Sequence, residues 1–372
     1  MKKDWAFIDL MRCIAAFWVM AAHVMIWGGW YGLPLPNGGL AVDLFMMISG
    51  FLMCLVAQAQ DAKGDDQKGR WRTFLLRRYF RIAPAYYVSL IIVFVAGGLF
   101  LAGYQAHQAM TPSWWPAGGN NDPARIHYTL ANFALHVSFL FGLLPKYAFS
   151  TFLPDWSLSL EMQFYVAFPL LWLGVRRFGY LATGIVAGAI ALASTALVFG
   201  QWAYTAPSFL PLKLQYFVAG MFIFRLLSQG AGRVERIALV IAALALAGFE
   251  HRDSNLWITS IVVLLAMLGL GQLEASGLAP SVVKALCANP IVRFLADASY
   301  GVYLFHGFFI SASGLIIAKT PALAALPPPT RVAVMAAFVM PLAVLSGWLS
   351  FRFVEKPAQK LGPSSLAGHR QG

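Results

Sequence analysis

Two ionisable residues, Arg12 and His23, interrupt the first apolar stretch of the chain, which runs from Phe7 to Trp30. This stretch is long enough to cross a bilayer as a helix. Eleven residues advance roughly 16 Å and make three turns plus about 20°, so both side chains lie on one face near opposite ends of the span. An imidazole with a near-neutral pKa can take the proton of a hydroxyl, and a guanidinium can hold an anion. Ionisable residues inside a membrane indicate a functional site by default. The structural alternative is that Arg12 pairs with Asp9 and that His23 is a core residue bonded to a neighbouring helix.

A carboxylate stands one turn inside another apolar run, in the stretch Asp155-Trp156-Ser157-Leu158-Ser159-Leu160-Glu161. Asp155 or Ser157 suits a helix cap at the outer surface, and Ser157 and Glu161 share one face. Glu161 needs a partner, for which Arg12 and His23 are candidates. We expect Glu161 at the depth of His23, where it orients the base or the acceptor hydroxyl. The alternative is a structural pair of Glu161 with an arginine.

Three further groups of polar residues lie in or beside apolar runs. Ser299, Tyr303 and His306 share a helix face, and His306 falls in the middle of its run. Asp43 lies seven residues before Gly50, where Ser49 and Gly50 allow close helix approach; Asp43 contacts either the site or only a helix interface.

Arg77, Arg78 and Arg81 precede a third run, where Pro84 suits the first helical turn. Their charge is explained either by membrane topology or by phosphate binding, because arginine forms forked hydrogen bonds with phosphate.

The composition predicts an all-α polytopic membrane protein. Hydrophobic residues make up 59% and charged residues only 11% of the 372 residues, whereas a soluble domain carries about 25% charged residues. We predict ten spans and a short re-entrant or interfacial helix at 131–145. The spans are 7–28, 40–58, 84–103, 157–175, 180–200, 209–228, 235–249, 255–271, 291–317 and 331–351.

The net charge of +12 follows this topology. With both termini cytoplasmic, most of the lysines and arginines fall on the inner side, as the positive-inside rule requires. The basic surplus therefore predicts membrane orientation and excludes a nucleic-acid-binding function. The spacing of the three cysteines gives no metal site, so we expect none.

These stretches together resemble the acyltransferase-3 family, a group of integral-membrane enzymes. The resemblance rests on six motifs in the same order: Arg12 with His23, Gly39 to Phe51, Arg77 to Tyr86, Trp156 to Glu161, Ser299 to His306, and Arg352 to Pro357. It implies a single transmembrane domain over 1–357, followed by a short cytoplasmic tail at 358–372.

The resemblance implies an O-acyltransferase of the bacterial cytoplasmic (inner) membrane. It would move an acyl group, expected to be acetyl, from cytoplasmic acyl-coenzyme A to a carbohydrate or glycolipid hydroxyl at the outer side. Acyl-coenzyme A is a co-substrate, and no permanently bound cofactor is expected. Membrane lipid is the other expected partner.

The expected roles divide the candidate residues into three groups. The catalytic residues are His23 as base, Arg12 and Glu161. The substrate-binding residues are Asp43, Ser157, Ser159, Tyr303 and His306, and the donor-binding residues are Arg77, Arg78 and Arg81. Acceptor choice is expected in the outer segments 104–130 and 146–156, where Trp114, Trp115 and Trp156 could stack on sugar rings or anchor the chain at the interface. The alternative function is a transporter that uses Arg12, Glu161 and His306 as a substrate or proton path.

Overall fold

The computed structural model describes residues 5–30, 37–62, 67–112, 122–201, 208–228, 230–248, 254–278, 281–287 and 289–363. Every regular element in these ranges is helical, so the all-α prediction is confirmed. The helices are α1 (Ala6–Gly28), α2 (Gly38–Asp61), α3 (Gln67–Met110), α4 (Leu130–Val137), α5 (Trp156–Gln201), α6 (Leu214–Leu227), α7 (Arg233–Gly248), α8 (Ser254–Ser276), α9 (Ser281–Cys287), α10 (Pro290–Ala318), α11 (Pro321–Ala324), α12 (Pro328–Ser350) and α13 (Lys356–Leu361).

Seven helices in the described part of the chain are long and apolar enough to cross a membrane. Each of the ten predicted spans falls on a helix, since α5 breaks at Gly179, which has a φ of 83°, and so covers two of them. Helices α6 and α7, with 14 and 16 residues, are shorter than the roughly 20 residues that a perpendicular span needs. The protein is therefore a multi-pass membrane protein, and the count of ten stays a prediction.

The segment 131–145 does not cross the membrane. It forms the eight-residue helix α4 and a 3₁₀ turn, η3 (Leu140–Leu143). Both are far shorter than a span, as the sequence predicted.

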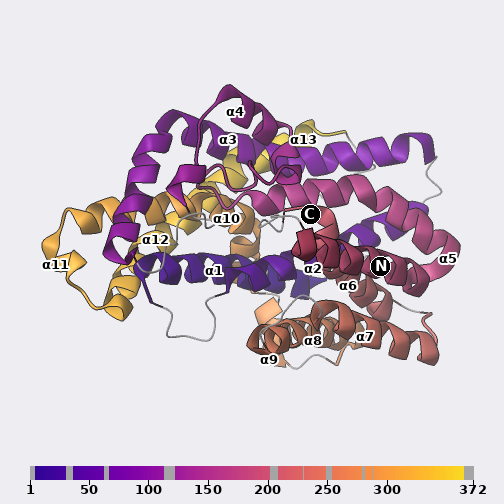
Figure 1. The fold of residues 1–372 in the computed structure, drawn as a ribbon. Helices are drawn as coiled ribbons and strands as arrows, with labels where there is room; N and C mark the ends of the chain where they lie inside the picture. Colours follow the sequence, from indigo (N-terminus) through magenta and orange to yellow (C-terminus); the bar gives the residue numbers. More distant parts are fainter. Residues whose placement is uncertain are drawn as a thin grey trace.

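Helix α1 lies at the centre of the molecule, with α7 to α9 on one side of it and α3 and α4 on the other (Figure 1). Its first turn is fixed by α8, because the Glu274 carboxylate accepts hydrogen bonds of 2.9 Å from the backbone N–H groups of Ala6 and Phe7. A carboxylate there also opposes the positive end of the helix dipole. Its last turn ends at Gly29, whose φ of 77° is left-handed and favours glycine.

Helices α1 and α10 run parallel and meet at two polar contacts. Arg12 donates a hydrogen bond to the Ser299 hydroxyl at 3.4 Å, and the rings of His23 and His306 are bonded at 2.8 Å. Both residue numbers increase from one contact to the other, which defines the parallel direction. The predicted topology has the same property, because its first and ninth spans run the same way.

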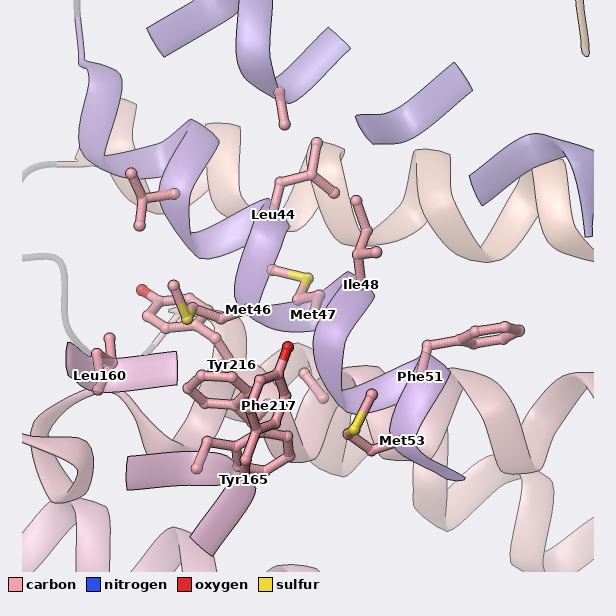
Figure 2. Close-up of a cluster of buried hydrophobic side chains, with 14 of the residues drawn as sticks. Leu44, Met46, Met47, Ile48, Phe51, Met53, Leu160, Tyr165, Tyr216 and Phe217 are labelled. Carbon is pink, nitrogen blue, oxygen red and sulfur yellow. The ribbon is translucent and has the colours of Figure 1, made fainter. Parts of the chain in front are cut away.

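Helices α2 and α6 cross with their backbones in contact. A Cβ atom at Gly50 would lie 2.0 Å from the Phe217 carbonyl oxygen, and one at Gly220 would lie 1.9 Å from the Met47 carbonyl oxygen. Only glycine fits at either position, which confirms the close approach predicted at Gly50. The apolar side chains of α2 surround this crossing (Figure 2). The crossing fixes the position of α2, which carries Ser49 to the site.

Candidate active site

A cavity of about 70 Å³ lies between α1, α2, α3, α5 and α10, and we call it the arginine cavity. Three arginines and one carboxylate line it, so its walls carry a net positive charge. Its polar lining consists of Arg12, Ser49, Arg78, Arg81, Ser157, Glu161, Tyr165, Ser299, Tyr300 and Tyr303.

Hydrogen bonds hold the carboxylate of the arginine cavity in place. Glu161 Oε1 accepts a bond of 2.9 Å from the Ser49 hydroxyl and a second bond from the Tyr165 hydroxyl, one turn along α5. Arg78 lies over the Tyr165 ring, with its guanidinium carbon 5.7 Å from the ring centroid. Arg12 lies 3.8 Å from Asp9, the pair expected from their spacing. These contacts orient the charged groups before any ligand binds.

A second cavity, of about 140 Å³, lies nearer the far ends of α1 and α10, and we call it the histidine cavity. Its walls are mostly apolar and include five aromatic side chains, of which Trp27 and Tyr104 pack with ring centroids 4.4 Å apart. Its lining consists of His23, Ile26, Trp27, Leu101, Tyr104, Gln108, Ile126, Phe149, Thr151, Phe152, Leu153, Pro154, Trp156, His306 and Gly307. An aromatic wall with a few polar groups suits a sugar ring.

Two histidines form the polar centre of this cavity. His23 Nδ1 lies 2.8 Å from His306 Nε2, and the two rings are stacked. His306 is fully buried, whereas His23 is only partly buried. His23 is therefore the member of the pair that can meet a substrate.

The side chain of Tyr303 lies between the two cavities. It lines the arginine cavity, and its ring centroid is 6.2 Å from that of His306 in the histidine cavity. Its hydroxyl donates to the Pro154 carbonyl, so the Ser157 hydroxyl, 2.7 Å away, must donate to Tyr303. This contact joins α10 to the first turn of α5 and closes the path between the cavities.

Seven of the ten predicted site residues besides His23 line one of the two cavities. Arg12, Arg78, Arg81, Ser157, Glu161 and Tyr303 line the arginine cavity, and His306 lines the histidine cavity.

The other three predicted site residues have structural partners elsewhere. Asp43 forms a buried ion pair of 3.0 Å with Lys213. Ser159 donates to the Phe139 carbonyl at 2.6 Å, and Arg77 Nε donates to the Pro363 carbonyl at 3.4 Å. None of the three lines either cavity, and their predicted substrate and donor contacts stay predictions.

The position of Glu161 differs from the expected one. From the sequence, Glu161 is expected at the depth of His23 and far from Arg12, but it lines the cavity that contains Arg12. The reason is that α5 begins inside the protein: Pro154 and Trp156 reach the histidine cavity, and Asp155 is buried. Glu161, more than one turn further on, therefore lies beyond His23 toward Arg12.

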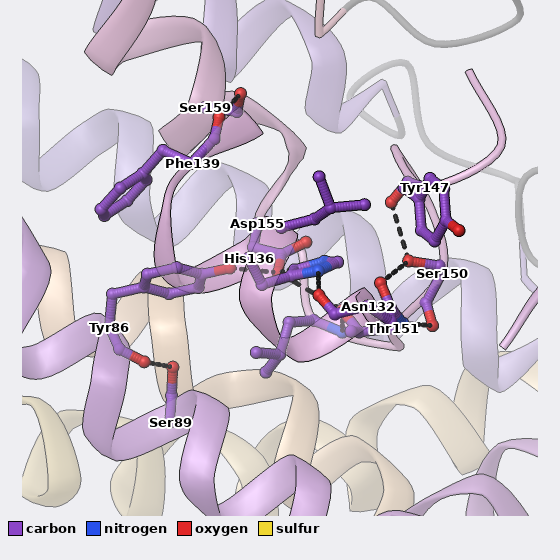
Figure 3. A network of polar contacts seen from close by, with 12 residues as sticks. Tyr86, Ser89, Asn132, His136, Phe139, Tyr147, Ser150, Thr151, Asp155 and Ser159 are labelled. Atoms are coloured by element: carbon purple, nitrogen blue, oxygen red, sulfur yellow. Dashed lines mark hydrogen bonds and ion pairs between the residues drawn. The ribbon is translucent and has the colours of Figure 1, made fainter. Parts of the chain in front are cut away.

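A buried polar network holds the segment before α5 (Figure 3). Asp155 Oδ2 accepts hydrogen bonds from the hydroxyls of Tyr86, at 2.9 Å, and Thr151, at 3.3 Å, and it lies 3.5 Å from His136 Nε2. Burial raises the pKa of Asp155 to about 7 and lowers the pKa of His136 to about 4. Both groups are therefore neutral near pH 6, because a charge is costly away from water. Asp155 was expected as a cap at the surface, whereas its side chain anchors α5 to α3 and α4.

Several residues of the site carried no clear signal in the sequence. Ser49 stood in a recognised stretch and Tyr165 lies one turn beyond another, but nothing indicated that both would bond Glu161. Trp27, Tyr104 and Gln108 come from two helix ends, and only the packing of α1 against α3 and α10 brings them together. Trp114 and Trp115 lie outside the described residues. Among the residues that are described, no group of three His, Cys, Asp or Glu side chains is arranged to hold a metal ion.

The comparisons with known proteins decide the family. A family model described as an acyltransferase domain matches residues 5–348, which is nearly the whole chain. The chain belongs to the acyltransferase-3 family. The protein is therefore an acyltransferase.

Acyltransferase-3 relatives of this chain include three proteins that are named for different roles. The chain is 25% identical over 355 residues to the acyltransferase MdmB of Streptomyces mycarofaciens, with 87% of this chain and 81% of that protein covered. It is 26% identical over 349 residues to the exopolysaccharide production protein ExoZ of Rhizobium meliloti, covering 87% of this chain and 90% of that protein. It is 25% identical over 382 residues to the peptidoglycan O-acetyltransferase OatA of Listeria monocytogenes, where it covers 95% of its own length but 56% of the relative. No solved structure matches the chain significantly.

Proposed function

We propose that this acyltransferase moves an acetyl group from cytoplasmic acetyl-coenzyme A to a hydroxyl of a carbohydrate or glycolipid at the outer side of the membrane. The observation that carries the proposal is the separation of two chemistries across Tyr303. Cationic groups gather in the arginine cavity, and a histidine pair with aromatic walls forms the histidine cavity. Two relatives, the exopolysaccharide production protein and the peptidoglycan O-acetyltransferase, support a carbohydrate acceptor.

The donor binds in the arginine cavity. Coenzyme A carries a diphosphate and a 3′-phosphate, and Arg12, Arg78 and Arg81 supply guanidinium groups from two helices. Its pantetheine arm then runs toward Tyr303. The thioester reaches His23 once this side chain has moved.

The acceptor binds in the histidine cavity, where Trp27, Tyr104 and Trp156 offer aromatic faces to a sugar ring. His23 takes the proton of the acceptor hydroxyl, and the alkoxide attacks the thioester carbonyl. The carbon–sulfur bond breaks, and the coenzyme A thiolate leaves as a thiol with the proton returned by His23. The transporter alternative is not needed, since family membership shows an acyltransferase.

The orientation belongs to the same proposal: a bacterial cytoplasmic (inner) membrane protein with both termini in the cytoplasm. Two exposed positions test it, Arg72 before the third span and Ser138 after α4. Cysteines placed there, in a chain without its three native cysteines, should react with an impermeant maleimide on opposite faces of the membrane. Labelling of both from one side would contradict the orientation.

A vesicle assay tests the function itself. Purified protein is reconstituted in vesicles with radiolabelled acetyl-coenzyme A on one side and, on the other side, surface glycan from the bacterium that makes the protein. We expect label on the glycan, detected by mass spectrometry as an acetyl ester, and a loss on the order of a hundredfold or more for His23→Ala. If correctly folded, inserted protein leaves the acetyl-coenzyme A chemically unchanged and the glycan unlabelled, the proposal is refuted.

A further inference from the structure

The hydrogen bonds of the histidine pair fix which nitrogen carries each proton. His306 Nδ1 lies 3.0 Å from the carbonyl oxygen of Val302, one turn earlier on α10. A carbonyl can only accept, so His306 Nδ1 carries a hydrogen. In the neutral ring the other nitrogen, Nε2, is then an acceptor. The buried residue thus presents a lone pair to α1.

The 2.8 Å contact between the rings then fixes the proton of His23. Since His306 Nε2 is an acceptor, His23 Nδ1 must be the donor and must carry the hydrogen. His23 Nε2 is then without a proton. Gly38 of α2 lies beside this nitrogen, since a Cβ atom placed at Gly38 would make an ordinary contact of 3.6 Å with it.

Burial keeps this arrangement neutral. His306 is fully buried, and aromatic and apolar side chains make up most of the cavity wall around the pair. No carboxylate lines the histidine cavity within the described part of the chain, so a second proton on the pair would be an uncompensated charge. The hydrogen-bond distances require one proton on each ring, and this neutral pair is also the state of lowest free energy in an apolar cavity.

We propose that His306 is a positioning residue that holds His23 in the Nδ1–H form, so that Nε2 of His23 is the base that meets the acceptor hydroxyl. This inference rests on the proposed function. It gives His306 a role other than the substrate contact expected from the sequence. A neutral imidazole does here what a carboxylate does behind the histidine of a serine hydrolase. In the membrane this choice avoids burying a negative charge.

The relay also stabilises the reaction's charged intermediate. When the acceptor hydroxyl transfers its proton to His23 Nε2, the ring becomes an imidazolium whose Nδ1–H still donates to His306 Nε2. The same proton leaves from His23 Nε2 to the sulfur of coenzyme A when the thioester bond breaks. No proton moves to His306, and no other reactant is required.

Three variants separate this role from simple packing. His306→Gln keeps an oxygen acceptor near the position of Nε2, whereas His306→Leu removes it. We expect His306→Leu to lower kcat about a hundredfold with little change in KM for either substrate, and His306→Gln to recover most of that loss. His107→Gln is the matched control, because His107 is equally buried and also bonds the α10 backbone, at the Ile310 carbonyl, but lines neither cavity.

Nitrogen NMR of histidine-labelled protein in lipid reads the tautomer directly and needs no substrate. We expect His23 to carry its hydrogen on Nδ1 in the wild type and to shift to Nε2–H in His306→Leu, the form that a histidine side chain prefers in water. A wild-type His23 protonated on Nε2, or a His306→Leu variant with wild-type kcat, would overturn the inference. If the wild type shows no acetyl transfer at all, the proposed function is refuted, but the tautomer measured by NMR remains valid.

Discussion

The hydroxyl groups of Tyr303 and Ser157 lie 2.7 Å apart, and this contact is the boundary between the arginine cavity and the histidine cavity. Tyr303 also donates to the Pro154 carbonyl, so one phenol holds both Pro154, two residues before α5, and the first turn of α5. A donor in one cavity and an acceptor in the other can react only after this contact opens.

Removing the ring of Tyr303 should join the two cavities. We expect Tyr303→Ala to raise acceptor-independent hydrolysis of acetyl-coenzyme A about tenfold relative to transfer, because water reaches the thioester. Tyr303→Phe keeps the ring and should change this ratio much less. The ratio of free acetate to acetylated acceptor measures the effect. Equal ratios in Tyr303→Ala and the wild type would show that the barrier lies elsewhere.

Arg12 should not be replaceable by lysine. Its guanidinium reaches Ser299 with one nitrogen and Asp9 with another, which the single ammonium of lysine cannot do. We expect Arg12→Lys to weaken coenzyme A binding about tenfold, nearly as much as Arg12→Ala, in calorimetry of the detergent-solubilised protein. Arg77→Lys is the control, because Arg77 lies on the same helix as two lining arginines but does not line the cavity itself. An Arg12→Lys protein with wild-type affinity would mean that a point charge suffices.

Glu161 should act on the donor and not on His23. The amide oxygen of Glu161→Gln can still accept from Ser49 and Tyr165, so stability should stay within about 1 kcal/mol of the wild type. The lost negative charge faces the three arginines, so we expect a several-fold change in KM for acetyl-coenzyme A. The pH dependence of kcat should be unchanged. A shift of that pH profile would place Glu161 functionally with His23.

Asp155 and His136 should give opposite pH dependences of stability. Burial raises the pKa of Asp155 from about 3.9 to about 7, so between these values the native protein holds a proton that the unfolded chain loses. Its contribution therefore makes the free energy of unfolding fall as the pH rises from 4 to 7. Burial lowers the pKa of His136 from about 6.5 to about 4, so its contribution rises with pH between 4 and 6.5.

Two variants isolate these contributions, which oppose each other in the wild type. His136→Gln leaves Asp155 alone, and its apparent Tm in detergent should fall from pH 4 to 7. Asp155→Asn leaves His136 alone, and its apparent Tm should rise from pH 4 to 6.5. Slopes of the same sign in both variants would contradict the burial of one of the two groups.

The sequence predicted most of the fold because hydrophobic length reports directly on membrane helices. It also predicted that Arg12 and His23 share a face, and both indeed pair with α10. It could not predict the neighbour of Glu161, because the depth argument assumed that α5 begins at the membrane surface. The buried turn at Pro154 and Asp155 shifts the helix inward, and such a turn depends on partners from α3 and α4.

Other parts of the site depend on tertiary contacts that no periodicity records. Lys213 forms an ion pair with Asp43. It directly follows a 3₁₀ turn, η4 (Leu210–Leu212), which positions its side chain. Ser159 faces the turn between α4 and η3 although Ser157, two residues earlier, faces the cavity, since two residues turn a helix by about 200°. Motif membership alone therefore does not separate cavity residues from structural ones.

The pairing of α1 with α10 has a consequence for biosynthesis. His23 and His306 are 283 positions apart, so at about 5 to 20 residues per second the ribosome needs roughly 15 s to 1 min to supply the partner. During that time α1 must sit in the translocon or the bilayer with an arginine and a histidine that α10 has not yet covered. A helix with two such residues inserts only marginally by itself. Helix α1 is thus made long before α10 can secure it, and truncation of the chain before α10 should leave α1 open to proteolysis.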